Sequence, residues 1–453
     1  MTFPPFTAAL DRRLRPKAPA PLAVGFSGGG DSLALLILTL DWARANGRAV
    51  VSLTVDHQLN PASAAWTAQA VAKAQALGAK ASGLSWTGDK PATGLPAAAR
   101  AARHALLADA TREAGASVLL LGHTQGDLAE AAAMRAEGST VSDPRDWAPS
   151  PAWPEGRRVF VLRPLLAVGR VELRDWLTAR GETWLDDPAN EDVTYARARA
   201  RRLLSSLEER SATGEVAAKP TDGTSAAAGA PSVTSPIGAA PPTPLHGGGE
   251  GYLILPRDAP AAQVAAACLC AAGTATPPRG ERLRRLVDRL RSGETFTATL
   301  AGARIEAGDT VGFFREPGES RRGPSPPPVG EVSAQLTEGG VIPRPTTPPT
   351  GPADRLPLGG RTLVWDGRYE ITATEPGLSV RPLQGLAARL PPAQRQALKG
   401  FPAAARASLP AIVDATGRVT CPILADTDQA RARCLVMDRF GAATGRVDQE
   451  PAT

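Results

Sequence analysis

Short apolar runs alternate with longer stretches rich in Ala and Leu along the first 200 residues of the chain. The apolar runs predict strands at 22–26, 49–56, 81–86, 118–122 and 159–162. The longer stretches predict helices at 32–45, 63–77, 96–114 and 127–137. Alternating strands and helices are typical of a parallel sheet with helices on both faces. The sequence therefore predicts a doubly wound α/β fold for this part of the chain.

The regular pattern is lost twice in the second half of the chain. Residues 206–251 are dominated by Ala, Gly, Pro, Ser and Thr, and residues 316–355 by Pro, as in linkers. Between them the apolar periodicity returns, with an amphipathic helix predicted at 281–291. The predicted organisation is a catalytic domain at 1–205, a linker at 206–251, a central, mainly helical domain at 252–315, a Pro-rich linker at 316–355 and a small α+β domain at 356–445.

Composition and charge narrow the function only slightly. The 453 residues include 51 Lys and Arg against 45 Asp and Glu, and the pI is near 9.4. This mild basic excess permits a polyanionic partner without establishing one. The cysteines form no C-x-x-C pair and the four histidines are scattered, so no zinc or iron–sulfur site is predicted. Free thiols indicate a reducing compartment. The cysteines are Cys268, Cys270, Cys421 and Cys434.

The sequence contains no membrane or export signal that we can identify. The first 21 residues mix Arg, Lys and Pro and lack the apolar core of a secretory signal. No stretch approaches the ~20 apolar residues of a membrane span. We therefore expect a cytoplasmic protein with no membrane partner.

A glycine-rich loop joins the first predicted strand to the first predicted helix. Its residues are Ser27, Gly28, Gly29, Gly30, Asp31 and Ser32. The glycines let the backbone approach a ligand closely, and the unpaired amides at the helix start favour an anion. The two serines add hydroxyl donors for phosphate oxygens, whereas Asp31 would repel phosphate and is therefore assigned to Mg²⁺. The alternative is a turn that only tightens the strand–helix unit.

The loop S-G-G-x-D-S resembles the PP-loop of the N-type ATP pyrophosphatases. The resemblance implies that the loop grips the β and γ phosphates of ATP, and that the enzyme transfers AMP to a substrate and releases pyrophosphate. The motif is specific for this superfamily but does not distinguish its members.

Further segments resemble the tRNA(Ile)-lysidine synthase family. The segment Thr54-Val-Asp56-His57-Gln-Leu-Asn60 is similar to the family's H-V-D-H-x-L-R, which lies near the adenine, so Asp56 and His57 are assigned to ATP. Arg100 and Arg103 match the helix A-R-x-x-R-Y-x-x-L. This match implies that Arg100 adds positive charge around the α-phosphate, and that Arg103 contacts tRNA.

The segment after the fourth predicted strand resembles the family's G-H-x-x-D-D-x-x-E-T. The match assigns Gly122 and His123 to ATP binding, and Asp127 to Mg²⁺ binding and catalysis beside Asp31. Two positions depart from the pattern, because Gly126 replaces the first of the paired aspartates and Ala131 replaces the threonine. The alternative role for Asp127 is a cap at the helix N-terminus.

Later segments follow the order and spacing of the same family. They are Arg163-Pro-Leu-Leu, Arg170-Val-Glu-Leu-Arg-Asp-Trp and Trp184-Leu-Asp-Asp-Pro-Ala-Asn190-Glu-Asp192. The arginines of the next segment are assigned to tRNA phosphates, namely Arg197, Arg199 and Arg201. A looser resemblance at 380–385 and 399–410 implies a terminal tRNA-binding domain.

The resemblance implies a ligase with tRNA(Ile), ATP, Mg²⁺ and free L-lysine as its partners. ATP would adenylate C2 of the wobble cytidine in the CAU anticodon, and the lysine ε-amino group would then displace AMP to form lysidine. The alternatives are a PP-loop enzyme for tRNA 2-thiolation and a tRNA-binding protein that has lost catalysis. Residues 1–205 contain no cysteine, which disfavours thiolation. The oligomeric state is open, a homodimer included.

Overall fold

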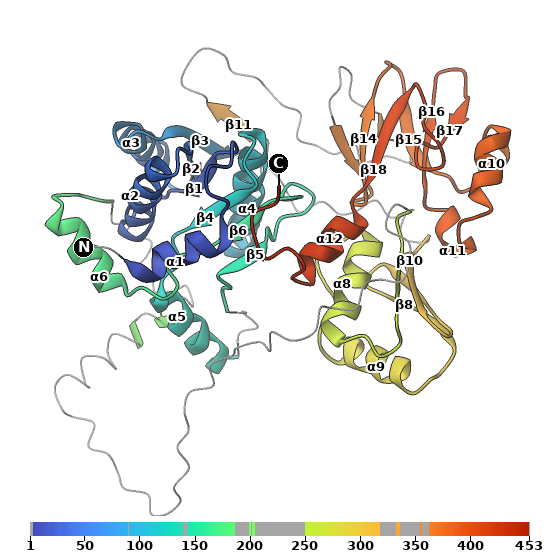
Figure 1. The fold of residues 1–453 in the computed structure, drawn as a ribbon, viewed down its shortest axis with the longest axis horizontal. Coiled ribbons are helices and arrows are strands. Elements are labelled where there is room, and N and C mark those ends of the chain that lie inside the picture. The colour runs from blue at the N-terminus through green and yellow to red at the C-terminus, as the bar shows by residue number, and fades with distance from the viewer. Residues whose placement is uncertain are drawn as a thin grey trace, which may run out of the picture.

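The structure is a computed structural model (Figure 1). It describes residues 3–88, 90–138, 143–185, 199–200, 202–203, 250–317, 332–335, 354–355 and 362–452. Nearly all of the predicted linker at 206–251 lies outside these residues, and only three short pieces of the linker at 316–355 lie inside them. No helix among the described residues is long and apolar enough to cross a membrane.

The N-terminal domain contains a seven-stranded sheet in the order β11-β3-β2-β1-β4-β6-β5. Its strands are β1 (Leu22–Gly25), β2 (Val50–Asp56), β3 (Lys80–Trp86), β4 (Val118–Leu121), β5 (Trp147–Pro149), β6 (Phe160–Leu162) and β11 (Val332–Gln335). The five central strands are parallel, and β11 and β5 pair antiparallel at the two edges. The predicted α/β fold with a parallel sheet is confirmed.

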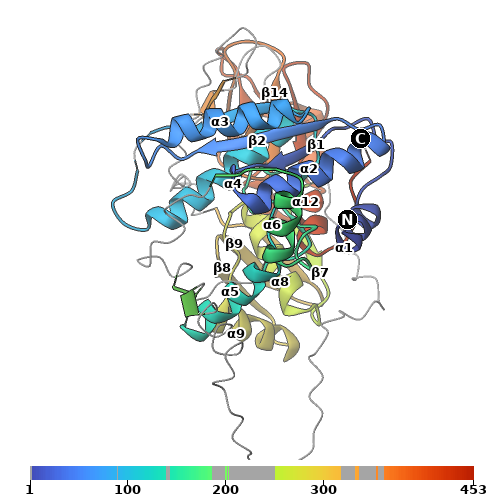
Figure 2. The ribbon, with the colours of Figure 1, turned by 90° about the vertical axis from the view of Figure 1, so that its left-hand side faces the viewer.

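In the part of this domain that the structure describes, six helices accompany the sheet, on both of its sides (Figure 2). They are α1 (Pro4–Arg13), α2 (Gly30–Ala45), α3 (Ser63–Ala76), α4 (Leu95–Glu113), α5 (Gln125–Ala136) and α6 (Arg170–Ala179). α2 is buried along most of its length, because α6 packs on it from outside and the sheet lies beneath. α1 was not predicted; it begins with proline in its first turn and buries Phe6 and Leu10 in the main core.

The order of the strands places a topological switch point between β1 and β4. β2 lies on one side of β1, and β4 lies on the other. The connections that follow β1 and β4 therefore diverge, and ligands bind such sheets in the crevice between them. The two connections nearly touch: a Cβ built on Gly122 would lie 3.1 Å from the Asp31 carbonyl oxygen.

The central domain has more sheet than the sequence predicted. Its elements are β7 (Leu253–Leu255), α8 (Ala261–Ala272), α9 (Gly280–Arg291), β8 (Phe296–Leu300), β9 (Ala303–Ala307) and β10 (Val311–Arg315). The strands form an antiparallel sheet, β7-β10-β9-β8. Beside its two helices, the predicted central domain therefore contains an antiparallel sheet that the sequence did not indicate. β9 alternates buried and half-buried residues, a pattern of period two that is too short to distinguish from loop by sequence alone.

The C-terminal part combines two small antiparallel sheets with short helices, as the predicted α+β domain requires. The sheets are β12-β15-β16-β17 and β13-β14-β18. The elements are β12 (Asp354–Arg355), β13 (Thr362–Trp365), β14 (Tyr369–Ala373), β15 (Ser379–Pro382), η3 (Ala387–Arg389), α10 (Pro392–Leu398), α11 (Ala403–Arg406), β16 (Pro410–Val413), β17 (Val419–Thr420), β18 (Ala430–Cys434) and α12 (Val436–Ala443). α12 packs on α8, and its Val436 and Phe440 complete the core of the central domain.

Candidate functional site

The glycine-rich loop runs from β1 into α2 and has the form of an anion site. Gly28 has a φ of +88°, in the left-handed region that favours glycine. The Ser27 and Ser32 hydroxyl oxygens lie 3.1 Å apart, and the Ser32 hydroxyl donates to the Gly29 carbonyl at 2.9 Å. α2 begins at Gly30, so its first amides have no partner within the helix and point out along its axis. These donors can receive phosphate oxygens.

Two residues that follow α6 lie directly against this loop. The Leu185 amide donates to the Gly28 carbonyl at 3.0 Å. A Cβ on Gly28 would lie 2.8 Å from Leu185 Cδ1, and a Cβ on Gly30 would lie 3.4 Å from the Trp184 ring. Close packing therefore restricts these two positions in addition to any ligand. At Gly28 the positive φ and the contact with Leu185 act together.

Three carboxylates from the two sides of the switch point surround one guanidinium. Arg170, the first residue of α6, donates from Nε to Asp31 Oδ2 at 2.9 Å. Its Nη1 lies 3.5 Å from Glu130 Oε1, and its Nη2 lies 3.9 Å from Asp127 Oδ2. Of these three contacts, only the one to Asp31 has the length of a strong charged hydrogen bond.

Asp127 also takes part in the capping box at the N-terminus of α5, where Thr124 is the N-cap. Its Oδ2 accepts the Thr124 amide at 2.8 Å, and the two residues form a capping box. The sequence posed the cap and a functional role as alternatives, but the capping carboxylate is the one that faces Arg170. Both Asp127 and Glu130 are buried, with 6% and 2% of their surface exposed.

Burial and charge compete at this cluster. Burial raises the pKa of Asp31 above its usual value, while the Arg170 charge opposes the rise and the Asp127 charge adds to it. Burial acts to lower the pKa of Arg170, but Asp31, Glu130 and Asp127 together outweigh it, so this pKa is raised. Within the described ranges, no group of three or more His, Cys, Asp or Glu side chains is placed to hold a metal ion. A metal here would need oxygens from a substrate as well.

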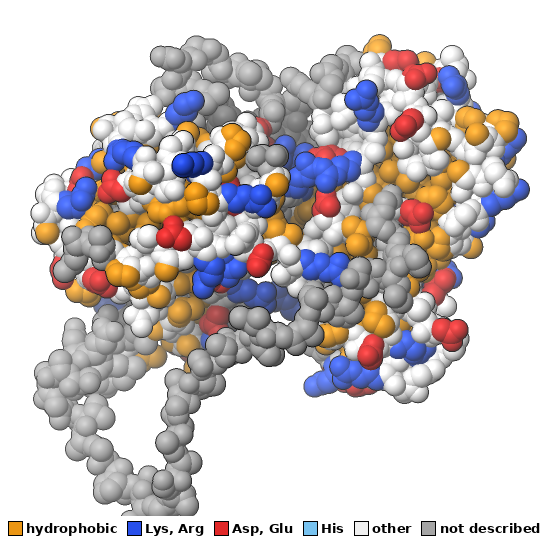
Figure 3. Space-filling view, viewed as in Figure 1, with side chains coloured by type: hydrophobic (Ala, Val, Ile, Leu, Met, Phe, Trp, Pro, Cys, Tyr) orange, Lys and Arg blue, Asp and Glu red, His pale blue; other side chains and the backbone are white. Residues whose placement is uncertain are grey.

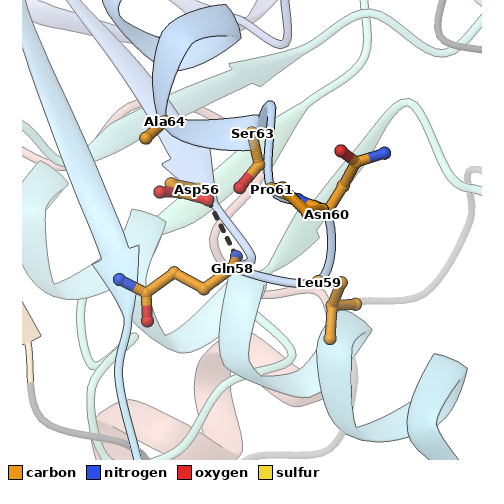
Figure 4. A pocket seen from close by; sticks show the side chains of 7 residues that line it. All are labelled: Asp56, Gln58, Leu59, Asn60, Pro61, Ser63 and Ala64. Atoms are coloured by element: carbon orange, nitrogen blue, oxygen red, sulfur yellow. Dashed lines mark hydrogen bonds between the residues drawn. The ribbon is translucent and has the colours of Figure 1, made fainter.

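The end of β2 borders an open hollow of about 410 Å³ (Figure 4). Asp56 is buried at its back, and its Oδ1 accepts the Gln58 amide at 2.8 Å. Gln58 itself has a φ of +53°, so this hydrogen bond holds a strained turn. The remaining lining residues are Leu59, Asn60, Pro61, Ser63 and Ala64. Polar and apolar groups both line the hollow, a mixture that is common in small-molecule sites.

A second, smaller hollow of about 260 Å³ adjoins the turn after β2. Its lining includes His57, Arg100 and Arg103, together with Pro96 and Ala99 of α4. Burial and the charge of Arg103, opposed by the charge of Asp56, together lower the pKa of His57 to about 4. His57 is therefore neutral at pH 7, and the positive charge of this hollow comes from the arginines.

The same arginines act on a buried histidine deeper in α4. Burial, together with the charges of Arg103, Arg100 and Arg163, lowers the pKa of His104 to about 2. Arg163 is itself buried, which lowers its pKa to about 10, and the Arg100 charge acts in the same direction. Three arginines from α4 and the end of β6 thus create a region of positive potential beside the switch point.

Comparisons with known proteins show which family the chain belongs to. The family of PP-loop domains matches residues 4–207. A tRNA(Ile)-lysidine synthase of Caulobacter vibrioides is 52% identical over 453 residues, which covers 98% of this chain and 98% of that protein. The chain belongs to the tRNA(Ile)-lysidine synthase family. Another tRNA(Ile)-lysidine synthase, from Hyphomonas neptunium, is 38% identical over 309 residues, covering 63% of this chain and 79% of that protein. The solved U34-tRNA thiolase NcsA of Methanococcus maripaludis has 16% identity and a TM-score of 0.36, over 46% of this chain and 72% of its own.

The structure describes most of the site residues that were assigned from sequence, and it places them in two adjoining regions. The glycine loop, Asp127, Gly122 and His123 meet at the switch point, and Asp56, His57, Arg100 and Arg103 lie along the adjoining strand end and α4. Arg199 is exposed, and Arg197 and Arg201 lie outside the described residues.

Sequence reasoning missed Arg170 and Glu130 as members of the site. Both stood in segments that resemble the lysidine synthases, but neither segment indicated a partner. Glu130 lies three positions after Asp127 on α5, a spacing that puts both on one helix face and could have signalled it. Arg170 comes from a different helix, and no spacing rule places it there.

Proposed function

We propose that this member of the tRNA(Ile)-lysidine synthase family uses ATP to adenylate C2 of the wobble cytidine in the CAU anticodon of tRNA(Ile). The ε-amino group of free L-lysine then attacks that carbon and displaces AMP, which leaves lysidine in the tRNA. The observation that carries the proposal is the meeting of the glycine loop and Asp127 at one switch point, in a chain 52% identical to a named lysidine synthase over nearly its full length. We place the reaction in the cytoplasm.

The loop would bind the phosphates of ATP. Amides at the start of α2 and the Ser27 hydroxyl can donate to the β and γ phosphates. The Ser32 hydroxyl, which donates to the Gly29 carbonyl in the structure, would turn to join them when ATP binds. Attack of the cytidine carbonyl oxygen on the α-phosphorus forms one P–O bond and breaks the bond to pyrophosphate. Donors fixed before the reaction stabilise the charge that develops on the leaving group.

The residues at the switch point fit a magnesium ion. Mg²⁺ is commonly held by one or two carboxylates with phosphate oxygens and waters, so Asp31 and Asp127 are sufficient protein ligands. The ion would supply positive charge to the phosphates when bound. Asp31 lies at the start of α2 and Asp127 in the first turn of α5, both at helix N-termini that open on the crevice.

The arginine-lined hollow would receive further negative charge of the substrates. Arg100 lies beside His57, which is neutral and does not compete for anions. We assign Arg100 to the α-phosphate and Arg103 to the tRNA backbone, because guanidinium groups bind phosphate through two parallel hydrogen bonds. Asp56, His57, Gly122 and His123 would then border the nucleoside.

The later domains would select the tRNA. Lys and Arg side chains gather along the junction between the N-terminal lobe and the other two (Figure 3). Single nucleotides offer too little surface to identify one tRNA, so contacts to the backbone outside the anticodon are needed. We assign these contacts to the C-terminal domain and to Arg197, Arg199 and Arg201.

One experiment tests the reaction directly. The purified chain is incubated with ATP, labelled lysine and an unmodified tRNA(Ile) transcript that carries CAU. We expect label in the RNA with equal formation of AMP, and none with a matched transcript whose anticodon is GAU, which lacks the wobble cytidine. Absence of label with the CAU transcript would contradict the proposal. Light scattering of the same preparation would distinguish a monomer from a homodimer.

The same reaction separates lysidine formation from thiolation. Cys268, Cys270 and Cys421 are buried, and burial raises the pKa of each thiol to about 11 or 12. Such thiols are protonated and enclosed, so they are poor sulfur carriers. Sulfur in the RNA after a sulfur donor replaces lysine would nevertheless favour thiolation.

A further inference from the structure

Arg163 is a buried arginine that has no carboxylate of the described chain within ion-pair distance. It is 8% exposed, and its Nε is buried without a hydrogen-bond partner. Its guanidinium donates from Nη1 to the Arg145 carbonyl at 2.8 Å. The Nε–H and the Nη2 donor, which share one edge of the guanidinium, are left over. A buried charge is costly unless it is both paired and hydrogen-bonded, so these donors indicate a missing partner.

The other buried arginines that the structure describes have their charge matched. Four of them contact carboxylates, in the pairs Arg48–Glu450, Arg157–Glu370, Arg315–Asp366 and Arg368–Asp366. The fifth, Arg439, lies 3.9 Å from the centre of the Trp153 ring and donates to the carbonyls of Leu269 and Thr274. Within the same ranges of the chain, Arg163 has neither a carboxylate nor an aromatic face. It is therefore the buried arginine best suited to an anionic ligand.

A buried histidine with the same deficit lies near Arg163. His104 of α4 is 5% exposed, and both of its ring nitrogens lack hydrogen-bond partners among the described residues. Burial and the charges of three arginines, Arg163 among them, lower its pKa to about 2, so the ring is neutral at pH 7. A neutral imidazole has one N–H donor and one acceptor. Buried polar groups are normally hydrogen-bonded, so two such neighbours point to a ligand that contacts both.

Arg163 lies at the edge of the sheet where this fold binds ligands. It directly follows β6, which pairs in parallel with β4, and α4 packs on β4. The C-terminal ends of parallel strands border the ligand crevice. Burial and the Arg100 charge lower the pKa of Arg163 to about 10, and the Asp127 charge opposes them, so Arg163 lies within range of the switch point and stays charged at pH 7.

The lysine carboxylate fits these two residues better than the other anions of the proposed reaction. The triphosphate of ATP is assigned to the glycine loop at the start of α2. The backbone of RNA is too bulky to reach side chains in residues that are 8% and 5% exposed. The α-carboxylate of free lysine is small and planar, and a guanidinium can bind a carboxylate through two parallel hydrogen bonds.

We propose that Arg163, together with His104, binds the α-carboxylate of free L-lysine. The proposal rests on the proposed function, in which lysine is the nucleophile. Nε and Nη2 of Arg163 would donate to the two carboxylate oxygens, and the N–H of His104 would donate to one of them. Held by its carboxylate, the lysine keeps its ε-amino group free to attack the adenylated cytidine.

A comparison of L-lysine with L-lysinamide tests this proposal. Lysinamide keeps both amino groups but replaces the carboxylate with a neutral amide. Formation of modified CAU transcript is measured with each nucleophile, for wild type and Arg163→Met. We expect wild type to prefer lysine by roughly 10- to 100-fold in kcat/KM, and Arg163→Met to lose most of this preference through a higher KM for lysine. An equal loss with both nucleophiles would indicate a structural role and overturn the proposal.

Three further variants guard the interpretation. Arg145→Met is the matched control, because it removes a positive charge from an exposed neighbour of Arg163, and it should leave the preference for lysine unchanged. His104→Leu should reduce the preference by several-fold. If Arg163→Met does not fold, Arg163→Lys keeps the charge but lacks the paired donors, and it should also reduce the preference.

The remaining outcomes separate this proposal from the proposed function. If Arg163→Met raises the KM for ATP and not that for lysine, the anion is a phosphate and the proposal is wrong. If wild type uses lysine and lysinamide equally well, the carboxylate site is rejected while lysidine formation stands. If wild type modifies the transcript with neither nucleophile, the proposed function itself fails.

Discussion

Arg48 and Arg170 are both ion-paired arginines of the catalytic domain, yet their surroundings differ in almost every respect. Arg48 is fully buried and meets one carboxylate, that of Glu450, through two hydrogen bonds of 2.7 Å. Its remaining donors reach the carbonyls of Ala20 and Arg15. Arg170 is partly exposed, faces three carboxylates and makes one short contact.

The difference separates a structural contact from a site. A buried arginine with its donors matched by one carboxylate and nearby carbonyls has no capacity for a further ligand. A partly exposed arginine that meets carboxylates from two helices is typical of a charged cleft where a ligand can bind. An ion pair alone therefore does not indicate function. The exposure of the arginine and the number of carboxylates that it meets distinguish the two cases.

The Arg48 contact joins the two ends of the chain. Glu450 lies 402 positions after Arg48, and its amide donates to the Arg13 carbonyl. The Trp147 indole donates to the Val447 carbonyl in the same segment. Figure 1 shows this red C-terminal segment returning from α12 to the catalytic domain. Since α12 completes the core of the central domain, the segment ties all three parts together.

The largest predicted effect is a loss of stability when the ion pair between Arg48 and Glu450 is broken. Glu450→Ala leaves Arg48 buried without its carboxylate, which should lower the free energy of unfolding by about 3–5 kcal/mol. Urea unfolding measures it. Asp448→Ala is the control, because it removes the same charge from an exposed position of the same segment and should change little. The double variant Arg48→Met with Glu450→Met should regain much of the loss; equal stability of Glu450→Ala and wild type would reject the structural role.

Asp31→Asn breaks the other arginine contact and should act on turnover instead. Loss of the charge that faces Arg170 and the proposed metal should reduce AMP release in the presence of tRNA and lysine by roughly 100- to 1,000-fold. The unfolding midpoint should stay close to that of wild type, in contrast to Glu450→Ala. Turnover that matches wild type would remove Asp31 from the site.

His104→Leu sharpens the comparison through pH. Neither ring nitrogen of His104 has a hydrogen-bond partner among the described residues. Its folded pKa of about 2 lies below the usual 6.5, so the unfolded chain takes up a proton first as the pH falls. Wild type should therefore lose stability below pH 6.5 by up to about 1.4 kcal/mol per pH unit more than His104→Leu. The free energy of unfolding of both proteins is measured at pH 7.5 and at pH 5.5. If it changes equally in wild type and in His104→Leu, then His104 is not held neutral in the folded protein.

Arg100→Gln should have the smallest effect of the four. The side chain is exposed, and a phosphate contact in solvent contributes less than a buried one. We expect the KM for ATP to rise by several-fold, to about tenfold at most, with unchanged stability. If only the KM for tRNA changed, the result would indicate that Arg100 contacts the RNA and not the nucleotide.

The sequence predicted much of the N-terminal domain because its helices are long and its strands are continuous apolar runs that alternate with them. The helix predicted at 63–77 is α3 (Ser63–Ala76), and the helix predicted at 96–114 is α4 (Leu95–Glu113). The central sheet was missed because strands such as β8 (FTATL) and β9 (ARIEA) mix polar and apolar residues over only five positions and form no continuous apolar run. The ATP loop was recognised because its residues are contiguous in the chain.

By itself, the sequence determined the α/β fold, the glycine loop and the membership of a family of ATP-using tRNA ligases. All three depend on patterns of residues that are close together along the chain. Only the tertiary structure decided which charges meet. Arg170 lies 139 positions from Asp31, and Glu450 lies 402 positions from Arg48. The physical reason is that side-chain charges interact through space over a few ångströms, whereas periodicity reports only on neighbours along the chain.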